Sequence, residues 1–466
     1  MKGFKATKSA SYAHEGVGSR LSSWRITGLS CILFALSLTS CAPKDQYTHI
    51  TVQRIFGECR ANVPQGQKPL RNPDGECEII TGLLDEFEKE NPDIKLKVNI
   101  AAWPGYDQLS AEYAAGDPPD LVTMHMSAMP DYQKRGLIVP LDAEFAAHKI
   151  NPSDFTPAAR KGVTIDNHVY GMPFDNWTQL WHINTALFAK AGLMKNGEPI
   201  LPRSPDEFIA QARQFKKATG LPYVIQATSN EQASYTRNLY TYLLDQHAAF
   251  FSDPKHIHLD TPEARRIVDL FRQLYAESLM THDQDYPAAM AAFLNGQGGT
   301  VQVGTWMIGA FTSESEIKGR PLYNAYTVKP YPMLYGPSLG LSGQTAYVDG
   351  HAWVMPKRQR TSAQSEAVLR LMKFLQAHDF DWSRTGHLPS QTAVAESAQY
   401  LDLPHRRDIV ALSSDGQTLP QGVQRQFAIS DIIGDELASA ETGHKTTEQA
   451  LKDAETRIND LLFHLL

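Results

Sequence analysis

The sequence predicts an α/β protein with a largely parallel sheet, and three observations lead to this fold class. Strand-like runs alternate with helical patterns from residue 48 onward, which is the order of elements in parallel α/β folds. The chain has 466 residues, more than a single core usually takes, so two or three lobes are expected. Hydrophobic residues make up 42% and charged residues 20%, a composition typical of soluble globular proteins that excludes disordered and collagen-like chains.

The first strand–helix–strand unit follows from residue periodicity. Residues 48–56 and 94–100 alternate between apolar and polar side chains, which predicts two strands. Between them, residues 78–91 place apolar side chains at helical spacing, and Pro92 ends the helix. Two further elements follow in the same pattern, a helix over residues 106–115 and a short buried strand over residues 120–124.

Later helices are indicated by residues that cap a helix N-terminus. Ser204, Thr261 and Thr446 each precede an apolar stripe at helical spacing, and a proline follows the first two at the first helical position. Residues 300–304 and 351–355 predict later strands. No period of 20 to 50 residues recurs, so a solenoid or propeller is not expected.

The first 40 residues differ from the rest and resemble an export signal. They carry five basic residues against one acidic residue, and residues 26–38 form an uncharged apolar run. This run is shorter than the roughly 20 residues that span a bilayer, which favours a secretion signal over a membrane helix. We therefore expect residues 1–40 to be a signal peptide and the protein to be exported to the cell envelope or periplasm.

The signal ends in Leu38-Thr39-Ser40-Cys41, which resembles the lipobox of bacterial lipoproteins. The resemblance implies that the Cys41 thiol carries a lipid and that residues 41–47 tether the folded part to a membrane. The alternative is a plain secretory leader in which Cys41 is incidental.

Two further cysteines, Cys59 and Cys77, flank a loop rich in glycine, proline and asparagine. An even pair in an oxidising compartment predicts a disulfide. A zinc site is disfavoured because Arg60, Gln65, Lys68 and Arg71, which lie between the two cysteines, supply no ligand that zinc prefers.

The common catalytic and cofactor motifs are missing from the sequence. No nucleotide-binding glycine loop, zinc-protease motif or serine-hydrolase elbow occurs. The i, i+2 spacing of His256 and His258 is a weak signal for a metal site, so no metal site and no cofactor are predicted. The formal net charge of −7 also argues against a nucleic-acid partner.

Five sequence clusters in one order carry a family resemblance. They occupy residues 117–122, 170–175, 181–193, 293–296 and 304–306. In this order they resemble the extracellular solute-binding proteins of ABC importers that take up sugars, the maltose-binding type, many of which are lipoproteins. The resemblance covers roughly residues 48–466 and includes a last helix near residues 448–454.

The resemblance implies a periplasmic-binding-protein fold, in which two α/β lobes are joined by a hinge that the chain crosses several times, with the ligand cleft between them. The implied first lobe comprises residues 48–172 and 300–346, and the implied second lobe comprises residues 173–299 and 347–466. The implied crossings lie near residues 171–175, 298–304 and 347–350.

A sugar offers C–H faces that stack on aromatic rings and hydroxyl groups that need fixed donors and acceptors. From the family pattern we expect ten ligand-binding residues at strand ends and near the hinge, namely Trp103, His125, Asp175, Trp177, Trp306, Tyr347, Asp349, His351, Trp382 and Arg384. The other two tryptophans of the body, Trp181 and Trp353, lie in apolar runs and are expected in the core.

The expected function is that of a lipid-anchored binding subunit that captures a neutral sugar or oligosaccharide by hinge closure and delivers it to the permease. Few cationic residues lie near the proposed site in the sequence, which favours a neutral solute. We expect a monomer and no catalysis. The alternative is a secreted carbohydrate-active hydrolase or lyase, for which Asp175 and Asp349 would be the first candidates for a carboxylate pair.

Overall fold

A computed structural model describes residues 46–59, 75–248, 251–336, 346–420 and 422–465. The expected signal peptide and Cys41 lie outside the described residues. Residues Tyr47–Leu466 form one compact unit. Among the described residues, none of the helices combines the length and apolar character needed to cross a bilayer.

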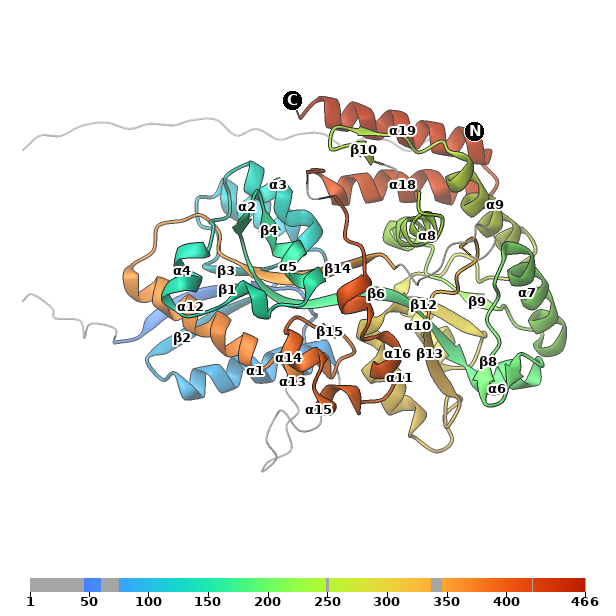
Figure 1. Ribbon diagram of the computed structural model, residues 1–466, viewed down its shortest axis with the longest axis horizontal. Coiled ribbons are helices and arrows are strands. Elements are labelled where there is room, and N and C mark those ends of the chain that lie inside the picture. Colours follow the sequence, from blue (N-terminus) through green and yellow to red (C-terminus); the bar gives the residue numbers. More distant parts are fainter. Residues whose placement is uncertain (1–45, 60–74, 249–250, 337–345, 421, 466) are drawn as a thin grey trace, which may run out of the picture. The chain divides into compact units, whose positions relative to one another are not determined.

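One mixed sheet runs through this unit in the strand order β2-β1-β3-β14-β6-β12-β9, and β13 and β15 also pair with β6 (Figure 1). Its strands are β1 (Thr48–Arg54), β2 (Ile94–Ile100), β3 (Leu121–His125), β6 (Met172–Asn184), β9 (Val224–Ile225), β12 (Thr300–Gly304), β13 (Tyr326–Pro330), β14 (Val348–Val354) and β15 (Leu388–Pro389). Three short hairpins join β4 (Thr164–Ile165) to β5 (His168–Val169), β7 (Met194–Lys195) to β8 (Glu198–Pro199) and β10 (Phe251–Asp253) to β11 (His256–Ile257).

Helices cover the sheet on both sides of the strand β6 (Figure 1). The longer ones are α1 (Glu76–Glu90), α2 (Tyr106–Ala114), α7 (Pro205–Thr219), α8 (Gln232–Asp245), α9 (Pro262–Ala276), α10 (Tyr286–Leu294), α11 (Ile308–Ser315), α12 (Ser362–Ala377), α18 (Gln426–Glu441) and α19 (Thr447–Phe463). The shorter ones are η2 (Met126–Ala128), α3 (Met129–Lys134), α4 (Asp142–Ala147), η3 (Pro152–Asp154), α5 (Pro157–Val163), α6 (Thr185–Lys190), η4 (Thr305–Met307), α13 (Asp379–Ser383), α14 (Thr392–Ala395), α15 (Ala398–Leu401), α16 (Arg406–Ile409) and α17 (Leu412–Asp415).

The expected elements of the first unit are confirmed. Strand β1 pairs in parallel with both β2 and β3, so that Val52 lies opposite Val98 on one side and Leu121 on the other. Helix α1 packs its stripe of Ile79, Leu83 and Phe87 into a core with these strands. We call the residues around this core the first lobe.

A second core lies on the other side of β6 and defines the second lobe. Trp181, Phe208 and Tyr223 contact one another there, and helices α7, α8, α9, α18 and α19 contribute their apolar faces. The predicted caps Ser204, Thr261 and Thr446 begin α7, α9 and α19, since each side chain accepts a hydrogen bond from a backbone N–H of the first turn. Trp181 and Trp353 are fully buried, as expected.

Two strands cross between the lobes. All thirteen residues of β6 are buried; residues 172–178 pair with β14, and residues 179–183 pair with β12. On the second strand, Tyr347, just before β14, packs in the second core, whereas Ala352 packs in the first. A strand that is buried on both faces can pack in two cores at once. Because β6 and the segment of Tyr347 and β14 run from one core to the other, we call these two strands the hinge (Figure 1).

The packing corrects the expected division of the chain. Strand β12 (Thr300–Gly304) pairs with β6 and β9, and Val301 and Phe311 pack with Ile225. The packing thus places β12 and β13 beside the part of β6 that enters the second lobe, and not in the first lobe. Residues 347–466 are also shared, because β14, α12 and Trp382 pack in the first core, whereas α18 and α19 pack in the second.

The sheet is mixed rather than largely parallel. Strand β14 is antiparallel to β3 and β6, and β12, β13 and β15 are antiparallel to β6. Parallel pairing needs a crossover connection between the strands, and the two hinge strands instead run in opposite directions between the lobes.

The disulfide between Cys59 and Cys77 is present, with an S–S distance of 2.13 Å. It joins the end of the β1 loop to the first turn of α1. This confirms the expected pairing of the two cysteines.

Replacing both cysteines by serine is expected to lower the free energy of unfolding by about 3 kcal/mol. The bond joins two residues that are 18 positions apart and so reduces the conformational entropy of the unfolded chain. Urea unfolding followed by tryptophan fluorescence measures the difference. A reductant should destabilise the wild type by a similar amount and leave the double variant unchanged; equal stability of wild type and variant contradicts this account.

Candidate functional site

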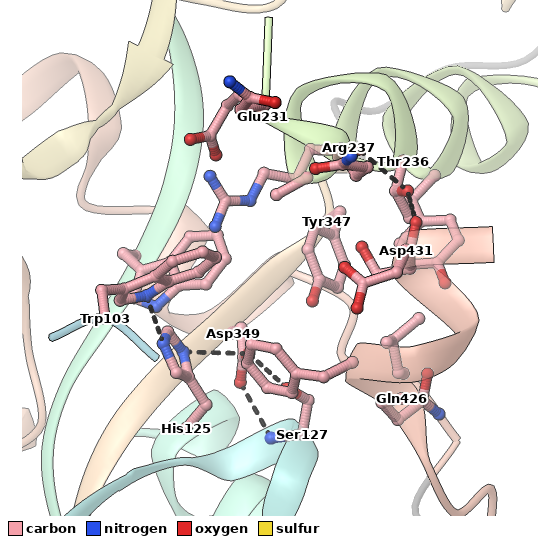
Figure 2. A pocket seen from close by; sticks show the side chains of 18 residues that line it. Trp103, His125, Ser127, Glu231, Thr236, Arg237, Tyr347, Asp349, Gln426 and Asp431 are labelled. Carbon is pink, nitrogen blue, oxygen red and sulfur yellow. Dashed lines mark hydrogen bonds and ion pairs between the residues drawn. The ribbon is translucent and has the colours of Figure 1, made fainter. Parts of the chain in front are cut away.

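Two adjoining pockets lie at the crossing of the two lobes, with volumes of about 80 and 510 Å³. The larger falls in the range of small-molecule sites. Five side chains line both pockets, namely Trp103, His125, Trp177, Glu231 and Arg237. The smaller pocket is also lined by Tyr240, Tyr347, Asp349, Phe427 and Asp431 (Figure 2), and the larger by Phe56, Glu76, Tyr286, Trp306 and His351.

The first lobe contributes residues at the carboxyl ends of its parallel strands. Trp103 follows β2, and His125 is the last residue of β3. The same edge is where open α/β sheets bind their ligands. The loop after β2 therefore presents an exposed indole, Trp103, to the pocket.

The two hinge strands contribute two pairs of residues that lie opposite each other. In the antiparallel register of β6 and β14, Trp177 lies opposite Asp349, and Asp175 lies opposite His351. Side chains two residues apart on a strand share one face, so all four lie on the same side of the hinge. This register explains why residues 170 positions apart in sequence form one site.

Hydrogen bonds and one close histidine–carboxylate contact link the first lobe to β14 (Figure 2). Trp103 Nε1 donates to His125 Nε2 at 3.0 Å, so His125 carries its proton on Nδ1, which lies 3.6 Å from Asp349 Oδ2. Asp349 also accepts from the backbone N–H and the hydroxyl of Ser127. Burial lowers the pKa of His125 to about 4. Burial opposes ionisation of Asp349, yet its hydrogen bonds lower its pKa.

A second network lies behind the pockets and is centred on Asp175, which is completely buried. Its carboxylate accepts from the backbone N–H of His351 at 3.0 Å, from His351 Nδ1 at 2.9 Å and from Trp382 Nε1 at 2.8 Å. Although burial opposes ionisation of both groups, their attraction lowers the pKa of Asp175 to about 2 and raises that of His351. The two form a buried ion pair across the hinge strands.

His387 adds a third group to this buried network. One ligand atom each from Asp175, His351 and His387 lies within 4.8 Å of the others, a spacing that a metal ion could bridge. However, His351 Nδ1 already donates to Asp175. A metal would have to displace this hydrogen bond, so the contacts favour the ion pair.

Seven of the ten expected ligand-binding residues line the pockets, namely Trp103, His125, Trp177, Trp306, Tyr347, Asp349 and His351. Asp175 and Trp382 lie in the buried network behind them, where they orient His351 and form no part of either pocket wall. Arg384 is also outside both pocket linings. Contact of these residues with a ligand stays a prediction.

Sequence reasoning missed Arg237 of helix α8. Its guanidinium carbon lies 4.8 Å from the ring centre of Trp177, 5.6 Å from that of Trp306 and 5.9 Å from that of Trp103. A signal was available, because Arg237 is the single basic residue in an α8 sequence that otherwise holds mostly buried, uncharged side chains.

Residues 78–379 match the family model described as bacterial extracellular solute-binding protein. The chain belongs to this family. As an extracellular solute-binding protein it is an exported or periplasmic component of an ABC transporter.

Two relatives illustrate the similarity in sequence. An uncharacterized ABC transporter extracellular-binding protein of Pyrococcus horikoshii is 22% identical over 251 residues, which cover 52% of this chain and only about half (55%) of the relative. The sn-glycerol-3-phosphate-binding periplasmic protein of Pectobacterium atrosepticum is 24% identical over 406 residues, covering 82% of this chain and 88% of that one.

The similarity in structure is broader. The maltose-bound MalE3 of T. maritima superimposes with a TM-score of 0.72 at 19% identity, and the match covers 89% of this chain and 99% of that chain. The superposition establishes the two-lobed fold that this solute-binding protein shares with MalE3.

Replacing Asp175 by asparagine is expected to lower the free energy of unfolding by about 3 kcal/mol, because it leaves the buried His351 cation unpaired. The raised pKa of His351 contributes stability below pH ~6.5 that is lost at higher pH, whereas the lowered pKa of Asp175 contributes above pH ~4 and is lost in acid. The difference between wild type and variant should therefore be largest between pH ~4 and ~6.5, measured by urea unfolding across pH.

Asp379→Asn is the matched control. Burial raises the pKa of Asp379 to about 7, so ionisation opposes folding, and this variant should gain stability relative to wild type as pH rises above ~4. A stability difference for Asp175→Asn that stays constant from pH 4 to 9 would contradict the ion pair.

Proposed function

We propose that this solute-binding protein captures a sugar or oligosaccharide by closure of its two lobes and delivers it to an ABC permease. The observation that carries the proposal is a cluster of three indoles contributed by both lobes. Trp103 comes from the first lobe, Trp177 from a hinge strand and Trp306 from η4 of the second lobe.

Aromatic rings and fixed polar groups suit a saccharide in complementary ways. The C–H faces of a sugar ring stack on indoles, and its hydroxyl groups bind donors and acceptors that are held in place beforehand. Asp349 is held by Ser127 and the backbone N–H of Gly350, and His125 is held by Trp103. Maltose bound to a protein of the same fold is in line with this proposal.

The proposed movement is bending at β6 and β14. A ligand that touches both lobes stabilises the closed arrangement only through its higher affinity for that arrangement. Tryptophans from both lobes line one pocket, so a bound ring would satisfy this condition.

We also propose that the solute leaves chemically unchanged. The alternative hydrolase needs two carboxylates that reach a glycosidic bond from opposite sides. Asp175 has no exposed surface and is occupied by His351 and Trp382, which disfavours the pair of Asp175 and Asp349.

Binding can be tested by calorimetric titration against mono-, di- and oligosaccharides. Trp306→Ala is expected to weaken binding by about 10-fold or more, because it removes a stacking face at the centre of the pocket, whereas Trp306→Phe should retain part of the affinity. Tyr323→Ala removes an exposed aromatic ring outside both pockets and serves as the control. Unchanged affinity in Trp306→Ala would argue against the aromatic site.

Lipid attachment at Cys41 and a monomeric state belong to the same proposal. Cys41→Ala is expected to move the protein from the membrane fraction to the soluble fraction of cells that process lipoproteins, since several acyl chains give firm anchorage. Cys31→Ala, which changes a cysteine of the leader, should leave fractionation unchanged. Membrane association that survives Cys41→Ala would refute the anchor.

A further inference from the structure

The side chain of Arg237 points into the site without a protein acceptor for its N–H groups. Among the described residues, its guanidinium makes no hydrogen bond and no ion pair. Glu231 lines the same pockets and interacts with it electrostatically, but no bond joins the two. Figure 2 shows the Arg237 side chain extending between Glu231 and Trp103.

Two other arginines of the second lobe, one partly buried and one exposed, have acceptors. Arg272 on the neighbouring helix α9 donates to the carbonyl of Ala440 and to the hydroxyl of Thr447, and Arg266 donates to Gln246 and Glu263. Arg237 is only partly buried, and none of its nitrogens is enclosed by the protein without a partner. Because Arg237 lines both pockets, a ligand there can supply the acceptors that the protein does not.

The geometry of the surrounding indoles restricts which acceptors fit. The ring centres of Trp103, Trp177 and Trp306 all lie within 6 Å of the guanidinium carbon, a range at which cation–π attraction helps to hold the group in place. A guanidinium held in this way still offers parallel N–H groups in its plane. Carboxylates and phosphates accept two such bonds at once, whereas a sugar hydroxyl does not.

The acidic residues of the site do not prevent an anion from binding. Burial raises the pKa of Glu76, to about 7, and also that of Glu231 and of Asp431. Glu76 is therefore partly protonated at neutral pH, and burial shifts the pKa of the other two carboxyl groups in the same direction. Asp349 is already compensated by the donors of Ser127 and Gly350.

We propose that the solute is a carbohydrate or polyol that carries a negatively charged group, and that Arg237 binds this group while the tryptophans bind the carbon skeleton. The proposal rests on the proposed solute-binding function and replaces the neutral solute expected from the sequence. The expectation of a neutral solute rests on the few cationic residues near the site in the sequence, whereas the fold brings Arg237 next to Trp177. Carboxylate and phosphate share the required chemistry, and the experiment below distinguishes them.

The test is calorimetric titration of the purified full chain with four probes. Digalacturonic acid presents a carboxylate, glucose 1-phosphate and sn-glycerol 3-phosphate present a phosphate, and maltose is neutral. At least one anionic probe is expected to bind about 10- to 100-fold more tightly than maltose, with an affinity that falls as salt increases. The anionic probe with the highest affinity shows whether the preferred group is a carboxylate or a phosphate.

Three arginine variants locate the effect. Arg237→Gln should remove the preference for the anionic probe, and Arg237→Lys should retain only part of it because lysine keeps the charge but lacks the planar pair of donors. Arg213→Gln changes an exposed ion pair on α7 that lines neither pocket and should bind as wild type. Since Arg237 makes no hydrogen bond within the described chain, its variants should keep the melting temperature of the wild type.

The possible failures are distinguishable. Equal binding of maltose and the anionic probes, unaffected by Arg237→Gln, would overturn the anionic solute and leave the sugar-binding function in place. Absence of heat and of a thermal shift with all four probes would overturn both proposals.

Discussion

The antiparallel pairing of β6 with β14 is the interaction on which the rest of the structure depends. Both strands are buried along their lengths. Strand β6 belongs to two hydrophobic cores, and β14 packs in the first core while Tyr347, just before it, packs in the second. At the crossing, Asp175 and His351 face each other as a buried ion pair. A buried pair of this kind is costly to break, because either partner alone would be an uncompensated charge in the interior. The ion pair therefore stabilises the register of β6 and β14 at the point where the lobes meet.

The site follows from that register. Because Trp177 lies opposite Asp349 and two positions from Asp175, the strand pairing brings a stacking surface and a hydrogen-bonding group to one face. The first lobe adds Trp103 and His125 at its strand ends, and the second lobe adds Trp306 and Arg237. The pocket is thus incomplete in either lobe alone. This arrangement couples ligand contact to the relative position of the lobes, which is the physical requirement for capture by closure.

The charge of the pocket lining differs from the net charge of the whole chain. The chain is acidic overall, yet the carboxyl groups lining the pockets are either held toward their neutral form by burial or compensated by donors. Arg237, surrounded by indoles, keeps donors that no described group accepts. Burial and geometry therefore decide the electrostatic character of this site, and a count of ionisable residues does not.

The sequence by itself determined the α/β class, the helix caps at Ser204, Thr261 and Thr446, the disulfide and the family, because periodicity, capping and cysteine pairing are local properties. It also identified seven residues that line the pockets. Only the tertiary structure decided that β12 and β13 lie beside the part of β6 that enters the second lobe, that Asp175 and Trp382 support the site from behind, and that Arg237 enters it. These features depend on which distant strands pair and on which side chains remain without partners. Such non-local contacts have no period in the sequence. Arg237 is marked in the sequence as the single basic residue of its helix, but its place among the tryptophans follows only from the packing.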